Sequence, residues 1–224
     1  MQLTFIYFDF PFWRAEVSKI ALFLADIDFE NKIITREAFQ NVKDHGKLDD
    51  GTVIPFHQLP CLLVDGAPIA QTGAIARFCG KLSGLYPTND NFSAAYTDQL
   101  IDFATDITVL VSNTGRDDND EVKRLKRQNL HKGELARKLN MLEKNLSSSK
   151  DWIVGNNIGL ADIAVWRLMG WLSSGVIDGL PVEILNEYPK INRICLSVDK
   201  HYKIQEWVKL TYPKNYVRGN YLPT

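Results

Sequence analysis

The sequence has few cysteines, and they are not arranged to bind a metal. Cys61, Cys79 and Cys195 are an odd number, lie far apart, include no Cys-x-x-Cys pair and have no nearby pair of histidines. This pattern indicates neither a zinc site nor a disulfide framework, so we expect no metal ion and a reducing compartment.

The sequence also lacks an excess of charge and long apolar runs. A net charge of −1 and a pI near 6.4 create no global field for nucleic acid or an anionic membrane surface. The basic residues between positions 123 and 132 are flanked by acidic ones and lack stacking aromatics, which is typical of a solvated helix face. No run reaches the roughly 18 to 20 apolar residues of a membrane span, and the N-terminal stretch has no basic residues ahead of its apolar run, which Asp9 interrupts. We therefore expect a cytoplasmic protein that binds neither nucleic acid nor membrane.

Strand-like and helix-like patterns alternate over the first third of the chain. Leu3 to Phe8 is rich in β-branched and aromatic residues and predicts a strand, while apolar residues at positions 17, 20, 21 and 24 predict one face of a helix. Residues 32–36 predict a second strand, which the helical crossover would pair in parallel with the first. Residues 41–52 are polar and contain glycine, which indicates a loop with at most one short helix.

A hairpin and a helix are predicted next. Asp65-Gly66, which readily takes the positive φ angles of a tight turn, separates two short apolar runs, Cys61–Val64 and Ala67–Gln71. Apolar residues then recur at helical spacing from Thr72 until Ser83-Gly84. The predicted order is therefore β-α-β-α-β-β-α.

Strand-like runs disappear beyond the loop at residues 85–90. Helical periodicities dominate instead, at residues 92–107, 135–146, 161–172 and 191–210, and the tail from Tyr212 to Thr224 is expected to be irregular. The pattern predicts an α+β domain at residues 1–83, a linker at residues 84–91 and an all-α domain at residues 92–224.

One block of the sequence carries a specific motif. The run from Gln58 to Gly66 reads QLPCLLVDG, and the run from Gln71 to Phe78 reads QTGAIARF. This block resembles the signature of the cytosolic glutathione transferase superfamily, sigma-like (tyrosine-type) class, and the resemblance extends more weakly over the whole chain. It implies a thioredoxin-like first domain, an all-helical second domain, and glutathione as co-substrate with no separate cofactor.

The resemblance implies a way to hold glutathione. In the family the proline, here Pro60, is cis, so that the backbone of Leu59 pairs with the cysteinyl part of glutathione. Thr72 would cap the following helix and, with Gln71, bind the γ-glutamyl carboxylate at the helix N-terminus. On the alternative reading, Thr72 is an ordinary cap, Leu59-Pro60 is a turn, and Gln71 is a polar residue at a strand end.

Phe39 and Lys43 are spaced like the tryptophan and lysine that contact the glycyl end of glutathione in sigma-like members. The resemblance implies that Lys43 neutralises the glycyl carboxylate and that Gln58 forms a hydrogen bond nearby. Phe39 lacks the indole donor of tryptophan. Alternatively, Lys43 is a solvated residue of a polar loop.

Tyr7 and Arg14 are the candidate catalytic residues. The pKa of a free thiol is about 8.5, and it must fall by about two units for the glutathione thiol to be mostly ionised at neutral pH. This fall requires roughly 2.7 kcal/mol, and one charge-assisted hydrogen bond supplies about 1.5 to 3 kcal/mol. Tyr7, at the end of the first predicted strand, resembles the tyrosine that donates this bond, and Arg14 resembles the arginine that steadies the thiolate. The alternatives are a half-buried core tyrosine and an arginine in a salt bridge. The loop at residues 9–13 is one residue longer than in sigma-like members.

Two aspartates of the helical half have counterparts in the family. Asp106 resembles the aspartate that dimeric members extend toward the γ-glutamyl amine bound to the neighbouring subunit, which implies a homodimer. Alternatively, Asp106 and Asp102 are two solvated carboxylates one helical turn apart. Asp162 resembles the N-capping residue of a buried helix, where Gly159 removes half of the reciprocal capping bond.

The resemblance implies an enzyme that joins glutathione to a hydrophobic electrophile, with peroxidase or isomerase reactions of the same thiolate as side activities. Two other readings stay open: a non-catalytic or structural protein of the same fold, and a prostaglandin-type isomerase. The electrophile is not identified, because Tyr96, Phe103 and Trp166 fit an acceptor pocket and a helical core equally well.

Overall fold

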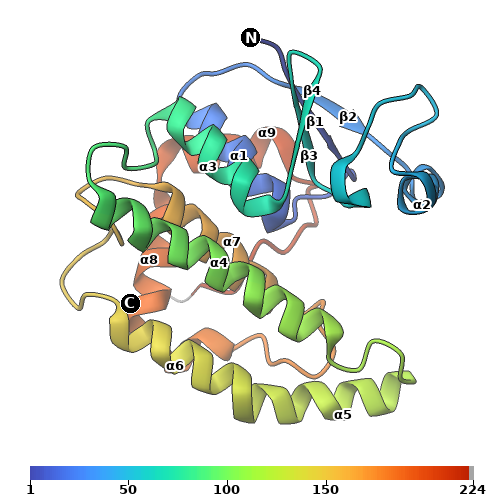
Figure 1. Cartoon of the computed structure of the whole chain (residues 1–224). Coiled ribbons are helices and arrows are strands. Elements are labelled where there is room, and N and C mark those ends of the chain that lie inside the picture. Colours follow the sequence, from blue (N-terminus) through green and yellow to red (C-terminus); the bar gives the residue numbers. More distant parts are fainter. Residues whose placement is uncertain (222–224) are drawn as a thin grey trace. The chain divides into compact units, whose positions relative to one another are not determined.

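The computed structural model describes residues 1–221, and the chain divides into two compact units between Asn89 and Asp90 (Figure 1). Each unit has its own secondary-structure content. In order, the first contains β1 (Leu3–Tyr7), α1 (Trp13–Leu24), β2 (Glu30–Ile33), α2 (Arg36–His45), a 3-10 turn (Pro55–His57), β3 (Cys61–Val64), β4 (Ala67–Ala70) and α3 (Thr72–Ser83).

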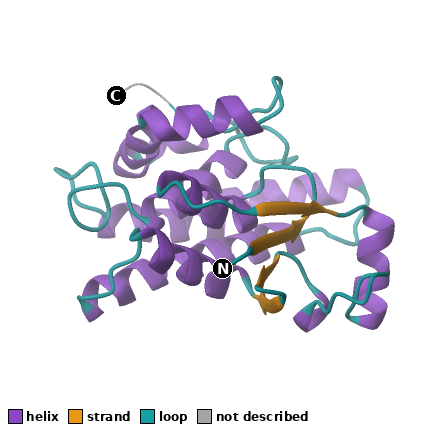
Figure 2. Ribbon diagram, turned by 90° about the horizontal axis from the view of Figure 1, so that it is seen from above, coloured by secondary structure: helices purple, strands orange, loops and turns teal. Residues whose placement is uncertain are grey.

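The strands of the first unit form one mixed sheet in the order β2-β1-β3-β4. They are drawn in orange in Figure 2. β1 is parallel to β2 and antiparallel to β3, and β3 is antiparallel to β4. β1 is buried on both faces, because Leu3 and Phe5 pack with residues of α1 and α3, whereas Ile6 packs with Val42 of α2. The predicted order β-α-β-α-β-β-α is confirmed.

Two predicted elements of the first unit are wrong in their bounds. β2 covers Glu30–Ile33 rather than residues 32–36, and Arg36 is the first residue of α2. The Thr35 side chain accepts a hydrogen bond from the Ala38 backbone N–H at 3.2 Å, which starts a ten-residue helix where mostly loop was predicted. The sequence signal was weak because the helix has few apolar residues, of which only Val42 is buried.

The hairpin and α3 agree with their predictions. Asp65 and Gly66 have φ angles of 49° and 83°, as a two-residue hairpin turn requires. Gly84 ends α3 at φ 74°, in the left-handed region that favours glycine.

The second unit is helical, and none of its described residues lies in a strand. It contains α4 (Asn91–Asn113), α5 (Asp120–Leu130), a π-helical turn (His131–Leu135), α6 (Ala136–Asn145), α7 (Leu160–Leu172), a 3-10 turn (Ile184–Glu187), α8 (Pro189–Lys200) and α9 (Tyr202–Thr211). The single helix predicted at residues 191–210 is wrong: His201 has extended backbone angles, φ −65° and ψ 129°, and separates α8 from α9.

α7 is the central helix of the second unit and buries polar side chains. The Asp162 carboxylate is fully buried and accepts hydrogen bonds from the backbone N–H groups of Ile153 and Gly159, both at 2.8 Å. Gly159 has no side chain, so the capping interaction is made from one side only. Burial raises the pKa of Asp162 to about 7, and the two N–H donors oppose that shift.

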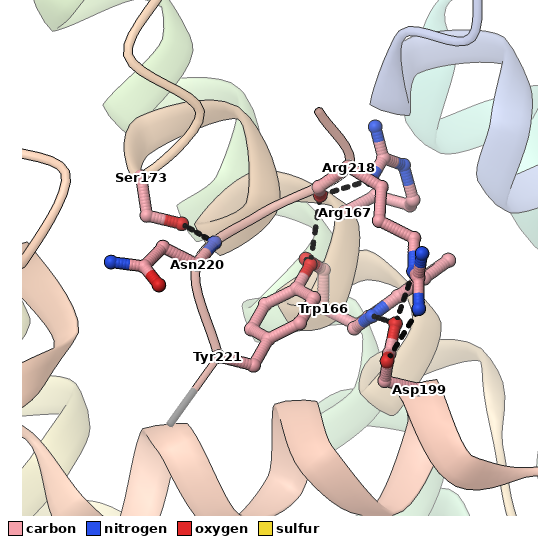
Figure 3. Close-up of polar contacts among 7 residues, drawn as sticks. All are labelled: Trp166, Arg167, Ser173, Asp199, Arg218, Asn220 and Tyr221. Carbon is pink, nitrogen blue, oxygen red and sulfur yellow. Dashed lines mark hydrogen bonds and ion pairs between the residues drawn. The ribbon is translucent and has the colours of Figure 1, made fainter. Parts of the chain in front are cut away.

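Residues 212–221, here called the C-terminal strap, have no helix or strand but are fixed to α7 and α8 by hydrogen bonds (Figure 3). Arg167, which is fully buried, donates to the Arg218 carbonyl oxygen at 2.9 Å and to the Tyr216 hydroxyl at 3.0 Å. The Arg218 guanidinium in turn donates to both carboxylate oxygens of Asp199, at 2.7 and 2.9 Å. The predicted irregular tail is therefore an ordered part of the unit as far as Tyr221, and its last three residues lie outside the described part.

Gly170 makes the close approach of the C-terminal strap possible. A Cβ atom at this position would lie 2.1 Å from the Arg218 carbonyl oxygen and 2.5 Å from the Tyr221 hydroxyl. The Tyr221 hydroxyl donates to the Trp166 carbonyl oxygen at 2.9 Å. The strap thus lies directly on the backbone of α7.

Candidate functional site

The sheet register brings the predicted site residues of the first unit to one end of the sheet. Ile6 pairs with Cys61, and Cys61 pairs with Ala70, in antiparallel ladders. The neighbouring positions, Tyr7, Pro60 and Gln71, therefore lie at the same end of their strands. Three segments far apart in the sequence converge there.

The peptide bond between Leu59 and Pro60 is cis, as the resemblance implied. Pro60 is buried, Leu59 is half-buried, and Gln58 before them is exposed. The segment enters β3 at Cys61, so the backbone of Leu59 lies at the sheet end next to the Tyr7 position.

Thr72 does not cap α3, and that prediction is wrong. Gln71 occupies the N-cap position with a positive φ of 73°, its side chain forms no capping bond, and Thr72 is the first helical residue. The N-terminal N–H groups of α3 are consequently not used by a side-chain cap. Thr72 is 5% exposed, and its hydroxyl accepts a long hydrogen bond of 3.5 Å from Arg14 Nη1.

Tyr7 ends β1 and is 5% exposed. Among the described residues we find no hydrogen-bond partner for its hydroxyl. Burial raises the pKa of Tyr7 above its ordinary value, Arg14 acts in the opposite direction, and Glu16 adds to the rise. The phenol is therefore protonated at neutral pH and can act as a donor but not as a base.

Arg14 reaches the site despite the longer loop before it. Phe12, the N-cap of α1, donates from its backbone N–H to the Phe10 carbonyl oxygen at 2.9 Å, so the loop at residues 9–13 makes a tight turn directly before the helix. Burial lowers the pKa of Arg14, while the nearby Tyr7 opposes that shift. Arg14 thus links Tyr7 and Thr72 from the first turn of α1.

Phe39 and Lys43 lie together on α2. The Lys43 Nζ atom is 5.0 Å from the centroid of the Phe39 ring, and Phe39 meets Phe8 edge to face with ring centroids 5.3 Å apart. Phe8 and Phe10 stack at 6.0 Å, and both rings contact Tyr7. We did not single out Phe8 or Phe10 from the sequence, although the aromatic run FDFPFW was visible there.

His57 is a second residue that the sequence analysis missed. It directly precedes the motif, and its Nδ1 atom lies 3.0 Å from the carbonyl oxygen of Lys43. Within the motif-based interpretation, nothing pointed to a contact between these two segments.

Asp106 belongs to the second unit and is not part of the arrangement in the first. It is exposed on α4 and, with Lys138, lines an open cavity of about 540 Å³. Tyr96 and Phe103 line a separate cavity of about 270 Å³ between α4 and α6, whereas Trp166 is fully buried in the core.

The described residues contain neither a candidate metal site nor a candidate membrane-spanning helix. Among residues 1–221, no group of three or more histidine, cysteine, aspartate or glutamate side chains is placed to hold a metal ion. Within the same range, no helix has the length and apolar character needed to cross a membrane.

Comparisons with known families agree with a two-part chain. The glutathione S-transferase N-terminal domain model matches residues 3–80, and the glutathione S-transferase C-terminal domain model matches residues 105–210. The chain is 25% identical over 203 residues to S-crystallin SL11 of Nototodarus sloanii, covering 88% of this chain and 90% of the relative. It is 26% identical over 213 residues to glutathione S-transferase 1 of Ascaris suum, covering 92% and 95%.

Solved structures share the fold. Prostaglandin synthase D of Nilaparvata lugens superimposes with a TM-score of 0.78 at 22% identity, over 95% of this chain and all of that one. A monomeric glutathione S-transferase of the hookworm Necator americanus, Na-GST-3, gives a TM-score of 0.77 at 20% identity, over 96% and 100%. The fold is that of a mixed-sheet unit followed by a helical unit, and the chain belongs to the glutathione S-transferase family.

Proposed function

We propose that this protein is a glutathione S-transferase that joins the glutathione thiolate to electrophilic small molecules, with peroxidase or isomerase reactions of that thiolate as side activities. One observation carries the proposal. The sheet register brings Tyr7, the cis Leu59–Pro60 segment and the start of α3 to the same end of the sheet. A hydrogen-bond donor for the thiolate, a strand-like backbone edge and an anion-binding helix end would then lie around one position.

Each part of glutathione has a proposed contact in the first unit, whose α+β domain we place at residues 1–83. The backbone of Leu59 before Pro60 pairs with the cysteinyl part. The N-terminal N–H groups of α3, with the Gln71 and Thr72 side chains, bind the γ-glutamyl carboxylate.

The glycyl end has its own proposed contacts. Lys43 neutralises the glycyl carboxylate, and exposed Gln58 donates a hydrogen bond nearby. Phe39 holds Lys43 at its ring face.

Tyr7 is the proposed catalytic donor. Its protonated hydroxyl stabilises the thiolate by a charge-assisted hydrogen bond, and the positive charge of Arg14 adds to that stabilisation. Glutathione itself brings the reacting sulfur, so the scheme uses no metal or separate cofactor. The proposed electrophile is hydrophobic. We assign its recognition to the all-α domain at residues 92–224, which follows the linker at residues 84–91.

We further propose a cytoplasmic homodimer of sigma-like class, in which Asp106 reaches the γ-glutamyl amine bound to the partner subunit. Asp106 is exposed on α4, as such a role requires. Sedimentation tests the assembly, and a single species of the 25.5 kDa chain mass would refute it. The monomeric hookworm relative makes this measurement necessary.

Retention on immobilised glutathione, followed by conjugation of a model aryl halide, tests the main proposal. We expect both retention and conjugation. Retention failure would favour a structural protein, a reading that the S-crystallin relative supports. Conversion of a prostaglandin endoperoxide without aryl halide turnover would favour the isomerase reading, which the prostaglandin synthase fold match supports.

A further inference from the structure

Two consecutive residues ahead of the cis-proline segment have an unusual backbone conformation. Phe56 and His57 have φ angles of 60° and 52°, in the left-handed region that non-glycine residues rarely adopt. Such conformations persist where surrounding contacts hold them in place. Both side chains are exposed, but the His57 ring makes contacts with α2.

The His57 ring lies against the end of α2. Gly46 ends this helix at φ 70°, and a Cβ atom on Gly46 would lie only 2.4 Å from His57 Nε2. The ring therefore fills the space that the missing side chain leaves.

The same ring also forms a helix cap. Its Nδ1 atom is 3.0 Å from the carbonyl oxygen of Lys43, one of the last carbonyls of α2, which have no partner within the helix. Because a carbonyl oxygen only accepts, Nδ1 carries the proton and donates.

We propose that His57 is a positioning residue for glutathione. This inference rests on the proposed function, in which Lys43 binds the glycyl end and Leu59 the cysteinyl end. His57 lies two residues before Leu59 and is bonded to the backbone of Lys43, so it sets the separation of the two contacts. Other contacts join the same segments: the Ile54 N–H donates to the Gly46 carbonyl oxygen at 2.8 Å, and Leu59 packs in one hydrophobic cluster with Val42 of α2.

His57→Gly is the direct test, because glycine accepts the positive φ but provides neither ring nor donor. We expect the KM for glutathione to rise about five- to ten-fold with kcat nearly unchanged at saturation, since Tyr7 lies on β1 and not on either segment. Phe56→Gly is the matched control: it relaxes the neighbouring positive φ without touching α2, and its KM should equal that of the wild type.

A shortened ligand separates positioning from general damage. γ-Glutamylcysteine has no glycyl residue, so its affinity, measured by calorimetry, should be nearly the same for wild type and His57→Gly. Equal losses for both ligands, or a wild-type KM for glutathione in His57→Gly, would overturn the inference. A wild-type protein that binds neither ligand would instead refute the proposed function.

Two further variants separate the hydrogen bond from the packing. His57→Phe keeps a ring over Gly46 but cannot donate to Lys43, and we expect a KM as high as that of His57→Gly. Gly46→Ala should displace the His57 ring and raise the KM in the wild type, but add little in the His57→Gly background. A wild-type KM in His57→Phe, or additive effects in the double variant, would contradict the assigned contact.

Discussion

Two small groups of polar side chains, one in each unit, are hydrogen-bonded to different extents. In the first, the Tyr7 hydroxyl has no partner among the described residues, and the bond from Arg14 to Thr72 is 3.5 Å long. In the second, Asp162 and Asp199 each accept hydrogen bonds from two groups, and Arg167 donates to the Arg218 carbonyl oxygen and the Tyr216 hydroxyl. Since a buried polar group is costly unless it is hydrogen-bonded, the bonded groups of the second unit stabilise the fold, whereas those of the first are the groups that we propose to contact glutathione.

Replacement of Arg167 should give the largest loss of stability. Arg167→Met removes the donor to the Arg218 carbonyl and the Tyr216 hydroxyl, as well as the stacking on Trp166. We expect the free energy of unfolding to fall by about 3 kcal/mol or more in urea titrations. Arg167→Lys, which keeps the charge without the planar fork, should lose less; a loss below about 1 kcal/mol for Arg167→Met would remove the contrast between the units.

Tyr7→Phe should lower turnover strongly and change stability little. Turnover with an aryl halide should fall ten-fold or more, equivalent to about 1.4 kcal/mol in the barrier, with little change in glutathione affinity. Stability should change by less than about 0.5 kcal/mol, because the removed hydroxyl has no partner among the described residues. Unchanged turnover would refute the role of Tyr7.

Asp162 should make the second unit sensitive to pH. Its pKa is raised to about 7 in the folded state, above the value near 3.8 of an unperturbed carboxyl, so its contribution is complete below pH 4 and is lost as the pH rises through 7. The free energy of unfolding of the wild type, relative to Asp162→Asn, should therefore fall between pH 4 and pH 7, by at most about 1.4 kcal/mol per pH unit. A relative rise over this range would mean that the two N–H donors outweigh burial.

Thr72→Val should have the smallest effect. It removes the hydroxyl that accepts from Arg14 but keeps the side-chain shape. We expect glutathione affinity to weaken two- to five-fold, about 0.4 to 1 kcal/mol, with restoration in Thr72→Ser. Calorimetry measures both, and an affinity loss shared by the serine variant would indicate a packing effect instead.

Local signals in the sequence predicted most of the first unit. Asp65-Gly66 fixed the hairpin through backbone preferences that depend on two residues alone. The motif from Gln58 correctly placed the cis-proline segment and α3. By contrast, the start of α2 was misplaced, because a mostly exposed helix has few apolar residues to mark it and its start depends on one cap, Thr35.

Patterns in the sequence did not predict the contacts between distant segments. The bond between His57 and Lys43 spans fourteen residues, and that between Arg167 and Arg218 spans fifty-one. The assignment of Thr72 as a cap failed for a local reason: Gln71 takes the N-cap position with a positive φ, so Thr72 is the first helical residue instead. The break at His201 also carried no proline or glycine to mark it.

The C-terminal strap has a consequence for how the protein is made. The first unit is complete at residue 89 and can fold while the rest of the chain is still being synthesised. The second cannot finish in the same way, because buried Arg167 donates hydrogen bonds to Tyr216 and Arg218, which are synthesised later. During synthesis, Arg167 of α7 therefore lacks these acceptors until residues 212–221 emerge from the ribosome. We expect nascent chains halted before that point to be captured by chaperones and proteases.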